Sequence, residues 1–184
     1  TNSEKTARMF FPSGTDMVAG GETVENVKFY LPTSTPAFVG RTFTLIESGK
    51  EIAKVEVTGV HKHDANYSRS GTCYECNHSS GYSLKLDNYV AEKECKFIAD
   101  ETRLFTIRLD ATASDDVTYI ITISDTTNFS MVVRNVVGNA VIALSPSGKL
   151  VIKKNKFELI GIHVTAKKYG TCKVRVAQVF SMSA

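Results

Sequence analysis

Histidine and cysteine residues, both common metal ligands, are concentrated in one polar segment of the chain. Residues 61–82 contain the sequence His-Lys-His-Asp and, further on, Cys-Tyr-Glu-Cys-Asn-His. Two cysteines separated by two residues form half of a typical structural zinc site, because two thiolates on one tight turn can reach the same tetrahedral ion. Cys95 and one histidine would complete a set of three cysteines and one histidine. The candidate ligands are Cys73, Cys76, Cys95, His61, His63 and His78.

The same cysteines could instead form disulfide bonds. The chain has four of them, including Cys172, and an even number permits two bridges. We expect one loop cysteine, Cys73 or Cys76, to pair with Cys95, and the other to pair with Cys172. Disulfide bonds are the first of three interpretations of these cysteines, free thiols are the second, and zinc binding is the third. We therefore expect no cofactor, with a structural zinc ion, which would hold the loop rather than catalyse a reaction, as the alternative.

The C-terminal part of the chain is strongly basic. From Lys149 onward it has eight basic residues and one acidic residue, a net charge of +7, whereas the whole chain carries +3. Lysines at the expected hairpin tip 153–156 and at the next connection could gather and bind an acidic or anionic partner. Lysines at exposed strand edges also prevent unwanted sheet pairing, which is the alternative explanation. The candidate binding residues are Lys153, Lys154, Lys156, Lys167, Lys168, Lys173 and Arg175.

Several functions are disfavoured by what the sequence lacks. It has no Gly-x-Ser-x-Gly, no His-Glu-x-x-His and no glycine-rich phosphate-binding motif. Asp115 and Asp116 are adjacent, and neighbouring carboxylates in a turn point apart. In the basic segment no interleaving of aromatic with basic residues beyond Tyr169 supports base stacking, so we expect no sequence-specific nucleic-acid binding. We predict that the protein is not an enzyme.

The elements that carry these residues are predicted to be strands. In 103–110 and 117–124 apolar and polar residues alternate, which is typical of strands with one buried face. About ten strands with short turns indicate an all-β fold, an antiparallel two-sheet sandwich. A jelly-roll arrangement is favoured over an immunoglobulin-like one, because the chain has no tryptophan for the Cys…Trp…Cys pattern.

The predicted strands alternate with turns rich in glycine, proline, serine and asparagine. At most one short helix is expected, near 88–99, and 61–82 is expected to be the longest loop. The strands are expected at 24–31, 42–47, 50–57, 83–86, 104–110, 117–124, 129–137, 140–144, 149–153, 157–165 and 172–180.

The chain is expected to consist of an N-terminal arm, 1–23, and a single β-sandwich domain, 24–184. The arm lacks periodicity but contains an apolar anchor, Met9, Phe10 and Phe11, which would dock on its own domain or on a neighbouring subunit. No apolar run approaches the roughly 18 residues that a membrane span requires.

These features together favour a protein that acts through its surfaces. We expect a non-catalytic structural or attachment subunit that self-associates, located on a virion surface or outside a cell. The alternative is a secreted, disulfide-stapled recognition domain that binds a protein or a glycan through 61–82.

Overall fold

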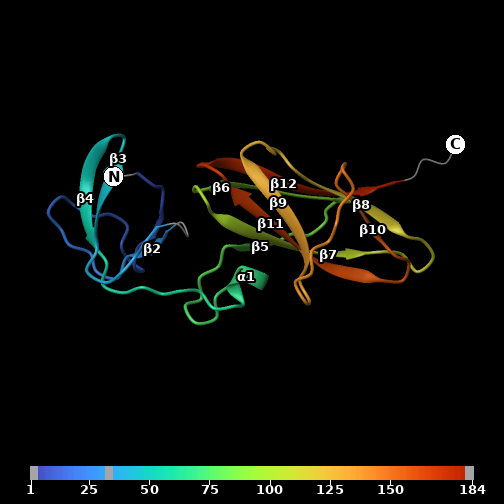
Figure 1. Cartoon of the computed structure of the whole chain (residues 1–184), viewed down its shortest axis with the longest axis horizontal. Helices are drawn as coiled ribbons and strands as arrows, with labels where there is room; N and C mark the ends of the chain where they lie inside the picture. Colours follow the sequence, from blue (N-terminus) through green and yellow to red (C-terminus); the bar gives the residue numbers. More distant parts are fainter. Residues whose placement is uncertain (1–3, 32–34, 181–184) are drawn as a thin grey trace.

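Strands make up almost all of the regular structure of this protein. The computed structural model describes residues 4–31 and 35–180, where a single helical turn, α1 (Tyr67–Ser70), accompanies twelve strands in four sheets (Figure 1). The all-β prediction is confirmed. Within these ranges no helix is both long enough and apolar enough to cross a membrane.

Two four-stranded sheets form the predicted sandwich. One sheet has the order β10-β8-β12-β6 and the other β5-β7-β11-β9, and every pairing is antiparallel except that of β5 with β7. The strands are β5 (Gly81–Ser83), β6 (Val90–Phe97), β7 (Thr102–Asp110), β8 (Val117–Ile123), β9 (Phe129–Asn135), β10 (Lys149–Ile152), β11 (Phe157–Ala166) and β12 (Gly170–Val179).

Consecutive strands of the sandwich lie in opposite sheets. From β5 to β12 the chain crosses to the other sheet at every connection, so hydrogen-bonded neighbours are distant in sequence. The prediction of a hairpin tip at 153–156 is therefore wrong, because β10 and β11 belong to different sheets. The segment is still a turn, in which Asn155 has a φ of 59°.

The segment near 88–99 is strand β6 and not the expected short helix. Ala91, Cys95 and Phe97 are buried, whereas the charged residues between them are exposed, so the burial has the period of a strand. A tight turn in which Asn88 has a φ of 47° leads into the strand. The strand is favoured over the helix because a strand turns alternate side chains toward the core. A helix would distribute the same side chains around its circumference.

The expected strand at 140–144 is reduced to a single bridge between Val141 and Arg134. The expected strand at 24–31 is shortened to β2 (Lys28–Tyr30). It pairs with β1 (Arg8–Phe10), a short strand within the segment expected to be an unpatterned arm.

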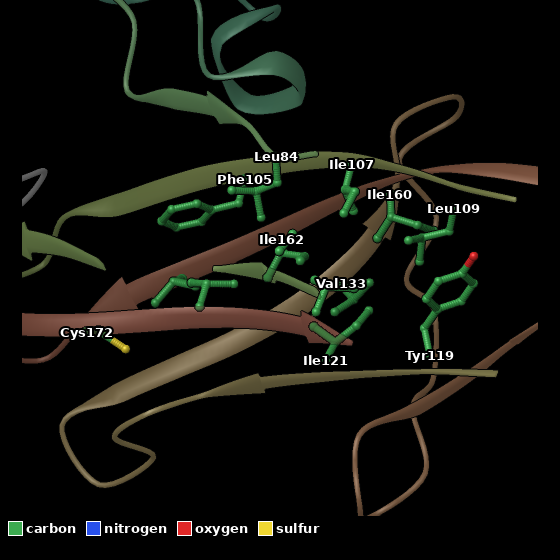
Figure 2. Close-up of a cluster of buried hydrophobic side chains, with 14 of the residues drawn as sticks. Leu84, Phe105, Ile107, Leu109, Tyr119, Ile121, Val133, Ile160, Ile162 and Cys172 are labelled. Atoms are coloured by element: carbon green, nitrogen blue, oxygen red, sulfur yellow. The ribbon is translucent and has the colours of Figure 1, made fainter. Parts of the chain in front are cut away.

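The core lies between the two sheets of the sandwich. Figure 2 shows Phe105, Ile107 and Leu109 of β7, which together with Tyr119 and Ile121 of β8 are almost completely buried. These are the residues whose alternation predicted inward-facing side chains. Burying one large apolar side chain contributes about 1.5–3 kcal/mol, so this layer is the main source of stability in the sandwich.

A separate hairpin is formed by β3 (Thr42–Glu47) and β4 (Lys50–Glu56). Figure 1 shows it at the end of the molecule opposite β10. The predicted turn is confirmed: Ser48 and Gly49 have φ values of 51° and 77°, as a two-residue hairpin turn requires.

A buried carboxylate attaches β1 to the sandwich. Glu101 is 1% exposed, and its Oε1 lies 3.1 Å from Nε of Arg8 and 3.4 Å from Nε of Arg103. Its Oε2 accepts a hydrogen bond of 2.8 Å from the backbone amide of Ile98. The two guanidinium groups compensate a charge that would otherwise be costly to bury.

Candidate metal centre and binding surfaces

The loop 61–82 folds back on itself around the side chain of Asp64. One carboxylate oxygen accepts a hydrogen bond from the backbone amide of Asn66 at 3.0 Å, and the other accepts those of Tyr74 and Glu75 at 2.8 and 3.3 Å. Desolvation opposes ionisation here, but the backbone amide of Tyr74, the side chain of Cys73 and the backbone amide of Glu75 hold the pKa of the Asp64 carboxyl below its usual range. Asp64 therefore joins the histidine-containing half of the loop to the cysteine-containing half.

Gly71 anchors the loop to the sandwich. It ends α1 with a φ of 73°, and its backbone amide donates to the carbonyl of Tyr67 at 2.9 Å. A Cβ atom at this position would lie 2.7 Å from Cα of Gly81, the first residue of β5. Glycine is therefore required both for the left-handed backbone and for the close approach of the two segments.

The folded loop brings two histidines and two cysteines together. Nε2 of His61 lies 3.3 Å from Sγ of Cys73, and Nδ1 of His63 lies 3.4 Å from Sγ of Cys76. All four candidate ligand atoms lie within 4.8 Å of one another. Cys73 is buried and the other three side chains are exposed or half-buried. Such an arrangement can enclose one small cation.

The two thiols of this cluster differ in acidity. Desolvation opposes ionisation of Cys73, but the backbone amide of Asp64 and the side chain of His61 lower the pKa of its thiol to about 6. Burial and the neighbouring Cys73 raise the pKa of the Cys76 thiol. The Cys73 thiol is therefore the more acidic of the two.

Aromatic rings from the loop and from the N-terminal strands pack around His63. Its ring stacks on Tyr67, with centroids 4.1 Å apart, and on His78, with centroids 5.1 Å apart. His78 in turn contacts Phe10 of β1 and Tyr30 of β2, at 5.4 and 5.6 Å between centroids. Burial lowers the pKa of His78. The structure thus places His78 in the ring stack that joins the loop to the β1–β2 sheet.

The structure assembles a different set of cysteines and histidines from the one expected. Cys95 and Cys172 lie directly opposite each other on β6 and β12, in the core of the sandwich, and all four cysteines are free thiols. The structure therefore differs both from the expected bridges between the loop and the sandwich and from the use of Cys95 as a ligand. Both His61 and His63 face the loop cysteines. The His-x-His spacing in the sequence indicates this shared direction, because alternate residues of an extended segment lie on one side.

The lysines of the basic segment do not gather at one place. Lys153, Lys154 and Lys156 precede β11. Lys167 and Lys168 follow it, and a strand of ten residues is about 33 Å long. The two groups therefore lie at opposite ends of β11.

The basic residues of β12 face acidic residues of β6. Lys173 is paired with Glu94 and Arg175 with Glu92 across the ladder, and Nε of Arg175 lies 3.0 Å from Oε1 of Glu92. Binding of an anionic partner by the basic segment stays a prediction.

The apolar residues of the expected assembly arm are only half covered. Met9, Phe10 and Phe11 are 39%, 43% and 43% exposed. Phe10 packs edge-on against His78 of the same chain. Docking of this anchor on a neighbouring subunit stays a prediction.

A depression of about 700 Å³ lies near the β10–β11 turn and is lined by Asp115, Asp116, Lys154 and Gln178, among others. The carboxylate of Asp116 accepts a hydrogen bond from the backbone amide of Lys154 at 2.8 Å and pairs with Nζ of Lys153 at 3.4 Å. The first of these contacts is the main reason that its pKa is lowered. Asp116 thus caps a turn.

Comparison with known proteins identifies no family. The sequence matches no family model and no curated protein. Three solved structures are similar to part of the chain: the periplasmic inhibitor of g-type lysozyme, PliG, from Salmonella Typhimurium, a mutant of PliG from Escherichia coli, and PliG from Aeromonas hydrophila. The TM-scores are 0.41, 0.42 and 0.37 and the sequence identities 9%, 8% and 12%. Each match covers 54% of this chain and 98%, 97% and 96% of the inhibitor, respectively. A likeness at this level assigns no function to the chain.

Proposed function

We propose that this chain is a non-catalytic protein-binding module that associates with a second copy of itself through the β3–β4 hairpin. The observation that carries the proposal is the open outer edge of this two-stranded hairpin. In the part of the chain that the structure describes, no other strand pairs with β3 or β4. A two-stranded hairpin alone is marginally stable in water, so a further strand would stabilise it.

The hairpin has one apolar face. Its register places Phe43 opposite Val55 and Leu45 opposite Ala53, so these four side chains share that face. Phe43, Leu45 and Val55 are only half-buried, and Ala53 is exposed. Apolar surface of this kind typically marks a contact with another protein.

The charges of β4 favour a second copy as the partner. If β4 pairs antiparallel with the β4 strand of a second copy, with the two-fold axis at Ala53, Lys50 of each copy lies opposite Glu56 of the other. The pairing also continues each two-stranded sheet across the interface, which satisfies backbone groups at the open edge of β4. The proposal keeps the predicted self-association but moves the contact from the arm to the hairpin.

A charge swap tests this pairing. Light scattering after size-exclusion chromatography should show a dimer of the full chain that dissociates on dilution. Lys50→Glu and Glu56→Lys should each weaken the dimer by about 5-fold or more, because like charges then face each other across the interface. The double variant should recover the wild-type affinity.

Lys85→Glu, on an exposed position outside the hairpin, is the matched control and should leave the dimer unchanged. A full chain that stays monomeric up to the highest soluble concentration would refute self-association through β4. A dimer that neither single variant weakens would place the contact elsewhere.

A further inference from the structure

We propose that His61, His63, Cys73 and Cys76 bind one Zn²⁺ ion in a closed, structural site. This inference is independent of the hairpin contact. It stands on the convergence of four ligand atoms of two types from two separate segments of the loop, all within 4.8 Å of one another.

The distances between the ligand atoms fit tetrahedral zinc. With Zn–S and Zn–N bonds of the usual lengths, about 2.3 and 2.0–2.1 Å, a sulfur and a nitrogen of the same tetrahedron lie about 3.5 Å apart. The nitrogen–sulfur distances of 3.3 and 3.4 Å in the His61–Cys73 and His63–Cys76 pairs are close to this value. The backbone therefore already holds both pairs at the spacing that the ion needs.

The choice of zinc and of a structural role follows from the ligands. Two thiolates and two imidazoles in a tetrahedral arrangement favour zinc over hard cations such as Mg²⁺ and Ca²⁺, which prefer oxygen ligands. Four protein ligands fill the tetrahedron and leave no position for a water molecule or a substrate, so the site would stabilise the loop rather than hydrolyse anything.

Groups around the four ligands are placed to orient them. A carboxylate oxygen of Glu75 lies 4.0 Å from Nδ1 of His61, the ring nitrogen that does not face Cys73. A carboxylate on the far side of a histidine is the usual outer partner of a zinc ligand. The backbone amide of Cys73 donates to the carbonyl of His78 at 2.9 Å, which closes the turn that holds both cysteines.

The position of the site gives the ion a mechanical role. The ring of His63 stacks on Tyr67 and His78, and His78 contacts Phe10 of β1 and Tyr30 of β2. On the other side, Gly71 fixes the same loop against β5 of the sandwich. Zinc would therefore hold rigid the segment through which the β1–β2 sheet packs on the sandwich.

Metal titration of the reduced full-length chain tests the proposal. We expect one Co²⁺ ion per chain, with the charge-transfer and visible bands of tetrahedral cobalt bound to thiolates, and displacement of Co²⁺ by one equivalent of Zn²⁺. Cys73→Ser, Cys76→Ser and His61→Ala should each abolish the tetrahedral spectrum. Circular dichroism should show that the strands persist in these variants, because none of the three residues belongs to the sandwich core.

Two further variants keep the test decisive if a ligand variant misfolds. Glu75→Gln changes an exposed side chain and should weaken Zn²⁺ binding by about 10-fold, as loss of an outer partner does. Cys95→Ala, on β6, is the matched cysteine control and should bind the ion as tightly as the wild type. Removal of Zn²⁺ with a chelator should speed hydrogen exchange of the β1 and β2 amides while leaving β11 protected.

Four results would overturn the proposal. These are absence of metal binding by the reduced full chain, binding that survives in both cysteine variants, binding that requires Cys95, and a disulfide bond between Cys73 and Cys76 in the native protein by mass spectrometry.

Discussion

The sandwich of residues 81–179 and the N-terminal region, residues 4–31 and 35–80, are stabilised in different ways. The sandwich buries a continuous apolar layer between two sheets, including Phe105, Ile162 and Val176. In the N-terminal region the two small sheets bury little, and Met17 and Ile52 are 86% and 56% exposed. There, specific contacts hold the chain: the Arg8–Glu101 ion pair, the ring stack at His63 and the proposed zinc site. Apolar burial thus makes a region stable by itself, whereas such pairwise contacts attach a region to another one.

The largest effect should come from the core of the sandwich. Phe105→Ala removes a completely buried ring, and we expect the free energy of unfolding to fall by about 3–5 kcal/mol. Met17→Ala, in the N-terminal region, should change it by less than about 0.5 kcal/mol, because the side chain is already exposed. Urea unfolding followed by circular dichroism measures both values. Similar losses in the two variants would contradict the distinction between the regions.

The second-largest loss of unfolding free energy should come from breaking the contact that joins the two regions. Glu101→Gln leaves Arg8 and Arg103 without their buried counter-charge and should cost about 3 kcal/mol. Glu94→Gln, at an exposed position of β6, is the control and should cost less than about 0.5 kcal/mol. Chemical denaturation gives the magnitudes. Hydrogen exchange should show that the β1 amides lose protection in the Glu101 variant, and unchanged β1 exchange would refute the attachment role.

A hydrogen bond within the sandwich should contribute less. The hydroxyl of Tyr119 donates to the carbonyl of Asp110 at 2.6 Å, so Tyr119→Phe should lower the free energy of unfolding by about 1 kcal/mol. Tyr74→Phe, in the loop, is the matched control, because its side chain is 72% exposed and should tolerate the change. Equal effects in a denaturant series would contradict this prediction.

The pH dependence of the sandwich should include a contribution from His163 on β11. Burial, and then the charge of Arg134, lower the pKa of this imidazole below its ordinary value of 6.5. The unfolded chain therefore takes up the proton at a higher pH than the folded chain. The folded state consequently loses stability as the pH falls below about 6.5, until His163 is protonated in the folded state too. Titration of the imidazole by NMR measures the shift directly, and a midpoint at or above 6.5 would reverse the predicted direction.

The smallest effect should come from the exposed ion pair between β12 and β6. Both Arg175 and Glu92 are nearly half-exposed, so Arg175→Ala should lower the free energy of unfolding by less than about 0.5 kcal/mol, an effect that added salt removes. Glu92→Ala should have the same effect, since it breaks the same pair. A loss above 1 kcal/mol in thermal unfolding at high salt would mean that the pair does more than neutralise surface charge.

Much of the fold could be predicted from local patterns. The alternation at 103–110 and 117–124 predicted which face of β7 and β8 is buried, and the Ser48-Gly49 pair predicted the β3–β4 turn. The strand β6 was missed because Val90, Phe97 and Ile98 also fit a helical face, and local spacing could not decide between the two.

The sequence predicted which residues could act as metal ligands, but not which four of them meet in the folded protein. The Cys-x-x-Cys and His-x-His spacings indicated the loop cluster, yet the chain offered six candidate ligands and no local signal excluded Cys95 or His78. Their exclusion depends on contacts with distant segments. Cys95 faces Cys172 across β6 and β12, and His78 packs between rings of β1, β2 and the loop.

The sequence by itself determined that the chain is built mainly of strands and which side chains β7 and β8 turn inward, because a period of two is a property of adjacent residues. Only the tertiary structure decided which strands pair, that consecutive strands alternate between sheets, and which four side chains meet in the loop. These depend on contacts that local spacing does not specify, between distant strands such as β11 and β7 and between separate parts of one loop such as Asp64 and Tyr74. Such contacts form only when the whole fold satisfies burial and hydrogen bonding together.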